Sequence, residues 1–176
     1  MTTYYNINPQ FYVSVDCIIF GFDKGSLKLL LLKRNFEPAK GSWSLMGGFV
    51  QDGESVDDAA KRVLAELTGL ENVYMEQVGT FGEVDRDPGE RVISVAYYAL
   101  ININEYDRNL VQQHNAHWAE INEIPPLVFD HPQMVSPNYA AKESLFRTHR
   151  FQPFAKPVHS VPTTKLVRSH LRRTFR

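Results

Sequence analysis

The chain has 176 residues, of which 43% are hydrophobic and 22% are charged. This composition is typical of a globular domain and excludes collagen-like, low-complexity and wholly disordered proteins. No apolar run approaches the roughly 20 residues of a membrane helix, and the first residues, MTTYYNINPQ, do not resemble a secretory signal. The single cysteine, Cys17, excludes an internal disulfide and any multi-thiolate metal site. It lies in an apolar run, so we expect a buried structural thiol and a reducing, cytoplasmic location.

The net charge of −1 conceals an uneven distribution along the chain. Residues 1–143 contain 11 basic and 20 acidic residues, whereas residues 144–176 contain 8 basic residues and no acidic ones. We therefore expect an acidic domain over residues 1–143, followed by a basic tail. A basic tail indicates an anionic partner such as a nucleic acid, and a solvated tail without a partner explains the same charge equally well.

The first predicted elements form a hairpin. Phe11–Phe22 is rich in β-branched and aromatic residues and predicts a strand, and Ser26–Lys33 predicts a second one. The intervening Asp23–Gly25 is typical of a tight turn. After a loop that contains Pro38 and Gly41, Trp43–Val50 predicts a short strand interrupted by two glycines.

The clearest helix of the sequence follows. Ser55 is a favourable N-cap residue, Asp58 stands three positions later, and Gly69 suits the C′ position. Apolar residues recur at helical spacing between them: Val56, Ala59, Ala60, Val63, Leu64 and Leu67. This pattern predicts an amphipathic helix that packs on a sheet.

Further strands are expected at Val73–Phe81, Val92–Ile103 and His117–Ile121, and a short helix beyond Asp130. Long β segments around one strong helix favour an α/β fold in which helices cover a mixed sheet, rather than a series of βαβ units.

One segment carries a motif of fixed spacing. Residues 48–70 read GFVQDGESVDDAAKRVLAELTGL, in which Glu54 follows Gly48 after five residues and Arg62 follows Glu54 after seven. This segment resembles the Nudix box. The stretch LKLLLLKRNFEPAKGSWSLMGGFV and the tetrapeptide VFDH at 128–131 also resemble that superfamily. The resemblance covers residues 11–133 and implies the Nudix fold, a mixed β-sheet sandwiched between α-helices.

The box departs from the family pattern where catalysis depends on it. In the family, three carboxylates on one face of the helix gather Mg²⁺ beside a diphosphate. The matching positions here are Val63, Glu66 and Leu67, so one carboxylate of three is present. The resemblance therefore implies a retained structural half, Gly48, Glu54, Arg62 and Gly69, and a lost catalytic half. Glu66 is the one candidate catalytic and metal-binding residue of the box, and Mg²⁺ is expected only if the chain is a hydrolase.

The polar loop at 82–91, GEVDRDPGER, together with the following SVAYYAL, resembles a stretch of ADP-ribose-type Nudix hydrolases and of Nudix-related transcriptional regulators. Its arginines are suited to phosphate or sugar hydroxyls, and aromatic residues near the box are suited to stacking on a base. For each single residue, a solvated or core position is the alternative. The candidate ligand-binding residues are Trp43, Gly47, Gly48, Phe49, Asp85, Arg86, Asp87, Arg91 and Tyr97.

The resemblance to the regulators implies a catalytically impaired sensor domain that binds a pentose such as arabinose, or a sugar nucleotide such as ADP-ribose, without a required cofactor. It also implies a homodimer and a DNA partner. Two other functions remain open: an active hydrolase that cleaves the diphosphate of an ADP-ribose-like nucleotide, and a nucleic-acid-binding protein that acts through its tail.

The tail is too short for the complete winged helix that follows the sensor in these regulators. Only 33 residues follow Glu143, and independent domains rarely have fewer than about 50 residues. The tail is therefore interpreted as a truncated or altered DNA-binding region or as a disordered segment. The candidate DNA contacts are Lys165, Arg168, Arg172 and Arg173.

Overall fold

The computed structural model describes residues 3–106, 111 and 113–136. The basic tail at 144–176 lies outside these residues, and so do the domain boundary at 143 and the DNA-contact candidates Lys165, Arg168, Arg172 and Arg173. These remain predictions.

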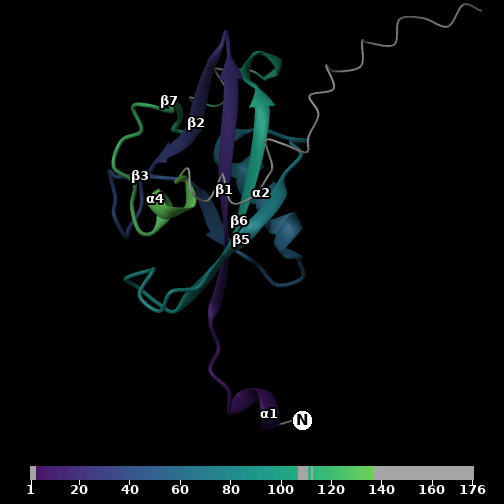
Figure 1. The fold of residues 1–176 in the computed structure, drawn as a ribbon. Coiled ribbons are helices and arrows are strands. Elements are labelled where there is room, and N and C mark those ends of the chain that lie inside the picture. The colour runs from purple at the N-terminus through teal and green to yellow at the C-terminus, as the bar shows by residue number, and fades with distance from the viewer. Residues whose placement is uncertain (1–2, 107–110, 112, 137–176) are drawn as a thin grey trace, which may run out of the picture. The chain divides into compact units, whose positions relative to one another are not determined.

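The longest strand, β1 (Tyr12–Asp23), organises the sheet (Figure 1). Eight consecutive residues of β1 are buried, which explains its continuous apolar sequence. β1 runs parallel to β6 (Val92–Asn102) along one side. On its other side it pairs antiparallel with β4 (Met46–Phe49) in its first half and with β2 (Ser26–Lys33) near its end. The strand neighbours of β1 thus change along its length.

Within the described residues, the sheet has seven strands in the order β3-β2-β1-β6-β5, with β4 on β1 and β7 on β2. The remaining strands are β3 (Trp43–Ser44), β5 (Glu76–Phe81) and β7 (Ala116–Glu120). β5 begins three residues later than predicted. Parallel and antiparallel pairs coexist, so the predicted mixed sheet is confirmed.

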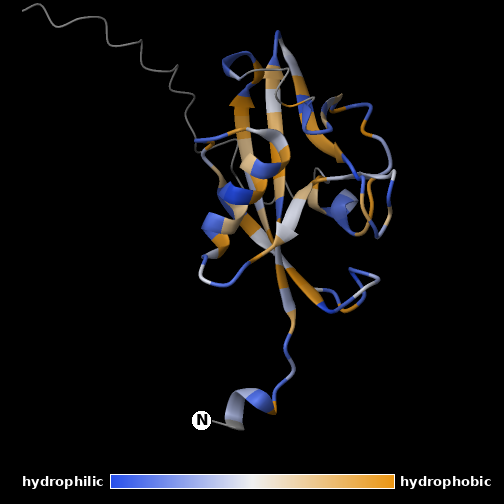
Figure 2. Cartoon of the chain, turned by 180° about the vertical axis from the view of Figure 1, so that it is seen from behind, coloured by the Kyte–Doolittle hydropathy of each residue, from blue (hydrophilic) through white to orange (hydrophobic). Residues whose placement is uncertain are grey.

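Each face of the sheet packs against its own helix. Val15, Cys17 and Ile19 of β1 belong to the apolar cluster beneath α2 (Val56–Thr68), which we call the α2 face. Ile18 and Phe20 point to the other side, where Met134 of α4 (His131–Met134) covers them; we call this the α4 face. In Figure 2 the strands are mainly orange and α2 alternates between blue and orange, as expected for a helix with one buried side. Cys17 is buried, as predicted.

The predicted helix is confirmed, and its ends have the expected causes. The Ser55 hydroxyl accepts a hydrogen bond from the Asp58 amide at 3.1 Å, which satisfies a donor left over at the helix start. Gly69 ends the helix in the left-handed region, with φ of 71°. Only glycine adopts this backbone conformation without steric cost.

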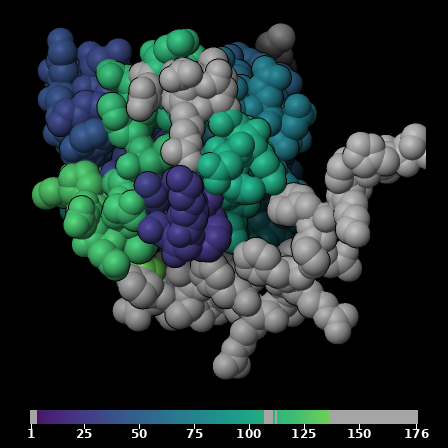
Figure 3. All heavy atoms as spheres, turned by 90° about the horizontal axis from the view of Figure 1, so that it is seen from above, coloured from purple at the N-terminus to yellow at the C-terminus, as the bar shows by residue number. Residues whose placement is uncertain are grey.

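Short elements complete the described chain: α1 (Thr3–Asn6) and η1 (Ile103–Glu105). α4 is short, as expected, and its proline lies in the first turn, where a helix tolerates it. Seen from above, the purple β1–β2 turn lies beside green and teal segments from later in the chain (Figure 3). Within the described part of the chain, no helix combines the length and apolarity needed to cross a bilayer.

Candidate functional site

The loop of the box is fixed to α2 by an arginine–carboxylate pair. Arg62 Nε donates to Glu54 Oε2 at 2.9 Å, and Nη2 donates to Glu54 Oε1 at 2.7 Å and to the Phe49 carbonyl at 3.0 Å. The Gln51 amide also donates to Glu54. These hydrogen bonds, that of Arg62 first, lower the pKa of Glu54 to about 2. The pair closes the box loop onto the helix.

Gly48 lies where β4 approaches α2. A Cβ atom at this position would lie 2.8 Å from Cγ2 of Val63, too close for any larger residue without movement. The absence of a side chain at Gly48 therefore leaves room for the apolar side chain of Val63.

Two of the three helix positions that carry carboxylates in the Nudix box are apolar in this chain. The Val63 side chain is buried in the α2-face cluster, and Leu67 packs against that cluster. Glu66 Oε2 accepts a hydrogen bond from Arg62 Nη1 at 3.0 Å, so this carboxylate already has a cationic partner. No group of three or more His, Cys, Asp or Glu side chains suited to a metal occurs in the part of the chain that the structure describes. This donor set does not fit Mg²⁺, which requires several oxygen ligands.

A second arginine–carboxylate pair lies buried on the α4 face. Arg86 Nε and Nη2 donate to the two carboxylate oxygens of Asp130, both at 2.8 Å, and Nη2 lies 3.3 Å from Asp16 Oδ2. The Arg86 side chain is only 4% exposed. A charge so deeply buried is tolerated only when it is paired and hydrogen-bonded.

Asp16 joins this pair to the rest of the α4 face. The Ser94 hydroxyl donates to Asp16 Oδ2 at 2.5 Å, and His131 Nε2 lies 3.4 Å from Oδ1. The Leu45 amide donates to His131 Nδ1 at 3.1 Å, so the ring proton is on Nε2, directed at Asp16. Burial raises the pKa of Asp16, but His131, Ser94 and Arg86 together hold that pKa below its usual value.

Because of this network, the Arg86 side chain is buried and paired, whereas a ligand contact was expected at this position. The guanidinium points inward and ties the 82–91 loop to Asp130, just before α4. The other charged candidates of the loop lie nearer the surface. Asp85 is exposed, Asp87 accepts from the Gly89 amide at 2.8 Å, and Arg91 closes the loop by donating to two of its carbonyls, those of Gly82 and Glu83.

The sheet separates the predicted ligand-binding residues into two groups. Tyr97 and Gly48 lie on the α2 face, where the Tyr97 hydroxyl donates to Asp57 of α2. Burial raises the pKa of Tyr97, and the Asp57 hydrogen bond adds to this effect. Gly47 lies against Asp16 with Arg86 on the α4 face. The structure therefore does not bring all the candidates into one pocket.

The aromatic candidates of the box region lie in different surroundings. Trp43 is half-buried on the α4 face, with its ring edge-on to His117 and the Lys33 ammonium 4.6 Å from its centroid. Phe49 is 52% exposed and packs against Tyr12. Of these two, Phe49 has the more accessible ring.

A stack that no sequence motif indicated lies near the 82–91 loop. The Arg34 guanidinium lies 4.3 Å from the Phe36 ring centroid and 5.3 Å from that of Phe129. Burial lowers the pKa of Arg34, and the neighbouring carboxylate of Asp87 opposes this effect. Phe129 has φ of 55°, a costly conformation for a bulky residue that is found mainly where the surroundings enforce it. Such a stack is suited to binding the planar ring of a ligand.

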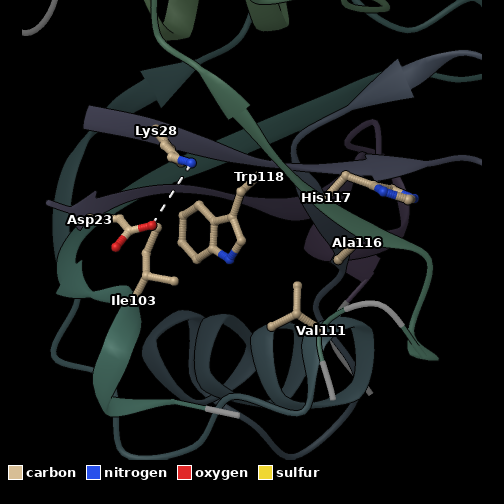
Figure 4. A pocket seen from close by; sticks show the side chains of 7 residues that line it. All are labelled: Asp23, Lys28, Ile103, Val111, Ala116, His117 and Trp118. Atoms are coloured by element: carbon tan, nitrogen blue, oxygen red, sulfur yellow. Dashed lines mark ion pairs between the residues drawn. The ribbon is translucent and has the colours of Figure 1, made fainter. Parts of the chain in front are cut away.

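A cavity of about 250 Å³ lies on the α2 face, and none of its lining residues belongs to the box loop (Figure 4). Its lining comes from the β1–β2 hairpin, η1, β7 and the single residue Val111 between η1 and β7. The residues are Asp23, Lys28, Ile103, Val111, Ala116, His117 and Trp118. None of them was a predicted ligand contact, because they share no local motif and meet only through the pairing of β2 with β7.

Comparison with known families agrees with this geometry. The family model of the NUDIX domain matches residues 10–138 of the chain. The chain is 34% identical over 136 residues to the ADPR responsive transcriptional repressor NtrR of Acinetobacter baylyi. The matched region is 75% of this chain and 54% of the repressor, so the chain spans about half the length of that relative.

Two further relatives bear on the site. The ADP-ribose pyrophosphatase of Methanocaldococcus jannaschii is 36% identical over 123 residues, which is 70% of each chain. The NUDIX domain of Shewanella oneidensis NrtR, in a cocrystal structure with ADP ribose, superposes with a TM-score of 0.63 at 29% identity. That match covers 81% of this chain and 98% of the other.

Proposed function

Because the chain belongs to the NUDIX domain family, we propose that it is a catalytically impaired sensor domain of a transcriptional regulator. Its effector is a sugar nucleotide such as ADP-ribose, or a pentose such as arabinose. Sensing requires differential affinity of the effector for two states of the protein, and needs no chemical step.

One observation carries the proposal. Two of the three positions that hold carboxylates in the family are Val63 and Leu67, both packed with the α2-face core, and Arg62 binds the remaining Glu66. The Glu54–Arg62 pair and the Gly69 helix end are intact. The chain thus keeps what shapes the box and lacks what would gather a metal there.

The nature of the effector is supported by the relatives and by the site. The repressor NtrR responds to ADP-ribose, and the NrtR domain was crystallised with it. The stack of Arg34, Phe36 and Phe129 offers planar groups near Asp87 of the 82–91 loop. The DNA partner and the homodimer belong to the proposal for the whole regulator.

A turnover assay tests the proposal. The purified chain is incubated with ADP-ribose and Mg²⁺, and the release of AMP is followed by chromatography. We expect no release above the protein-free control. The paired substitution Val63→Glu/Leu67→Glu, which restores the family's carboxylates, provides the comparison for metal binding. Robust hydrolysis by the unmodified chain would contradict the proposal.

The second candidate function is hydrolysis, which the 36% identity to an ADP-ribose pyrophosphatase favours. An active enzyme would have to use Glu66 with carboxylates from the 82–91 loop. In that case Glu66→Gln would abolish turnover, whereas Glu71→Gln, outside the helix, would retain it.

A further inference from the structure

Exposed aromatic side chains lie together before and at the start of β1. These rings are between 46% and 73% exposed: Tyr4, Tyr5, Phe11, Tyr12 and Phe49. Ile7 and Val13 belong to the same stretch and are exposed as well. Single apolar residues at a surface are ordinary, whereas a group of large ones indicates an interaction site.

Residues 3–10, which we call the arm, lead away from the sheet to α1 (Figure 1). The arm has contacts of its own. Asn8 Nδ2 donates to the Tyr4 carbonyl at 2.7 Å, and the rings of Tyr4 and Tyr5 meet edge to face with their centroids 5.8 Å apart. A helix of four residues is nevertheless too short to be stable in water by itself. The arm therefore requires a surface to pack on.

The surface next to the start of β1 is aromatic. The rings of Tyr12 and Phe49, which we call the aromatic pair, contact each other with their centroids 5.4 Å apart. The arm of the same chain leaves this pair uncovered, since both rings are more than half exposed. A second copy carries the same arm and the same pair, so each arm can cover the pair of the other copy. Such an exchange closes into a two-fold dimer.

The charge of this stretch favours a protein surface as its partner. Residues 3–15 contain no Asp, Glu, Lys or Arg. The centres of protein interfaces have few charged residues and many tyrosines and phenylalanines. A nucleic acid or an anionic membrane would instead be bound through several Lys or Arg side chains. The Arg91 guanidinium, 5.3 Å from the Phe11 ring centroid, borders the stretch and suits the polar rim of an interface.

The exposed area is sufficient for a dimer of this chain. The exposed parts of the five rings amount to about three whole aromatic side chains, or roughly 450–750 Å² at about 150–250 Å² each. Two copies together therefore offer roughly 900–1,500 Å² before Ile7 and Val13 are included. Stable, specific interfaces bury roughly 1,200–2,000 Å². Two copies of the chain reach this range without a third molecule.

We propose that the chain forms a two-fold dimer in which the arm of each copy packs on the aromatic pair of the other. The inference rests on the proposed function, to which a homodimer belongs, and it names the surface of that dimer. The Phe49 carbonyl accepts from Arg62 Nη2 at 3.0 Å, so the interface borders the box loop. An effector held by this loop can therefore bind the monomer and the dimer with different affinities.

Sedimentation velocity of the full chain without ligand measures the association. Protein concentrations from about 0.1 to 100 μM cover the weaker interfaces of this size. We expect a dimer whose dissociation constant rises at least tenfold in Tyr4→Ser/Tyr5→Ser and in Phe49→Ser. Exposed aromatic residues elsewhere supply the matched controls: Tyr74→Ser, as exposed as Tyr5, and Phe22→Ser, as exposed as Phe49 to within 3%. Each control should change the dissociation constant less than twofold, and circular dichroism checks that every variant is folded.

A mixing experiment tests the exchange itself. The Tyr4→Ser/Tyr5→Ser chain has an intact aromatic pair, and the Phe49→Ser chain has an intact arm. A heterodimer of the two variants therefore regains one of the two contacts between an arm and a pair, whereas each variant alone has none. The mixture should associate more tightly than either variant alone.

Three results would overturn the proposal: a monomer at every concentration, a dimer that the arm and Phe49 variants leave within twofold, or a mixture no tighter than its components. A monomer whose arm binds neutral phosphatidylcholine vesicles, with binding lost in Tyr4→Ser/Tyr5→Ser, would also overturn it and assign the arm to a lipid surface. Failure of the exchange is distinct from failure of the sensor function. Metal-dependent AMP release would refute the sensor function alone, whereas a monomer that binds ADP-ribose in the presence of chelator would refute the exchange alone.

Discussion

Two arginine–carboxylate pairs, one on each side of the sheet, show what the box retains and what the rest of the fold adds. Arg62 and Glu54 are eight residues apart and lie at the edge of α2, with side chains 23% and 15% exposed. Arg86 and Asp130 are 44 residues apart, and both are nearly inaccessible. The first pair shapes a local loop, whereas the second connects distant segments inside the molecule, so we expect different costs when each is broken.

The largest effect is expected from Arg86→Met. The substitution leaves Asp130 and Asp16 buried without their cation, which typically costs about 3–5 kcal/mol. Urea unfolding at pH 7 measures this loss. Arg91→Met is the matched control, because Arg91 donates to loop carbonyls at the surface and should cost much less. Equal losses in the two variants would contradict the assigned role of Arg86.

Acid should weaken the buried network next. The pKa of Asp16 is lower in the folded chain than its usual 3.8, so its stabilisation is complete above pH 3.8 and is lost as the pH falls through the folded pKa. The urea midpoint, measured from pH 7 down to pH 2, should decrease as the pH falls below 3.8. The Asp16→Asn variant should show a shallower fall, and an unchanged slope would argue against the network.

The end of the box helix should be less sensitive. Gly69→Ala places a side chain at φ of 71°, which costs about 1 kcal/mol. Gly82→Ala, at a position with open space and no positive φ, should leave the free energy of unfolding unchanged. The two glycines can be compared by thermal unfolding, and a larger cost at Gly82 would contradict this explanation of the helix end.

The smallest effect is expected at Glu54. Its folded pKa of about 2 lies below the usual 4.5, so its contribution is present above pH 4.5 and is lost between that pH and about 2. Because this pair is more accessible to water than the Arg86–Asp130 pair, salt screens it more strongly. Glu54→Gln should therefore lower the free energy of unfolding less than Arg86→Met does. In 1 M salt, the loss caused by Glu54→Gln relative to the unmodified chain should become smaller. A loss as large as that of Arg86→Met would remove the distinction between the two pairs.

Local patterns made most of the fold predictable. Helix α2 could be located from spacing alone, because its signals all act within one helix. These signals are the helical repeat of apolar residues from Val56 to Leu67, the capping Ser55 and the terminal Gly69. The hairpin of β1 and β2 was equally local. The start of β5 was set three residues too early, since the apolar Val73 is buried in the core without belonging to a strand.

The site was less predictable because its contacts are distant in sequence. Arg86 was expected to reach a ligand, since a polar loop gives no sign that Asp130 and Asp16 lie beneath it. A charged residue within the apolar strand β1 was the available signal for the network. The cavity near Trp118 depends on the pairing of β2 with β7 and on the close approach at Gly21, which no spacing rule reveals.

The central claim is that the effector binds without a metal. Its most direct test is calorimetric titration of the purified chain with ADP-ribose, once with Mg²⁺ and once with chelator. The account predicts the same affinity under both conditions and recovery of intact ADP-ribose afterwards. Binding that requires Mg²⁺, together with conversion of ADP-ribose to AMP, would contradict it.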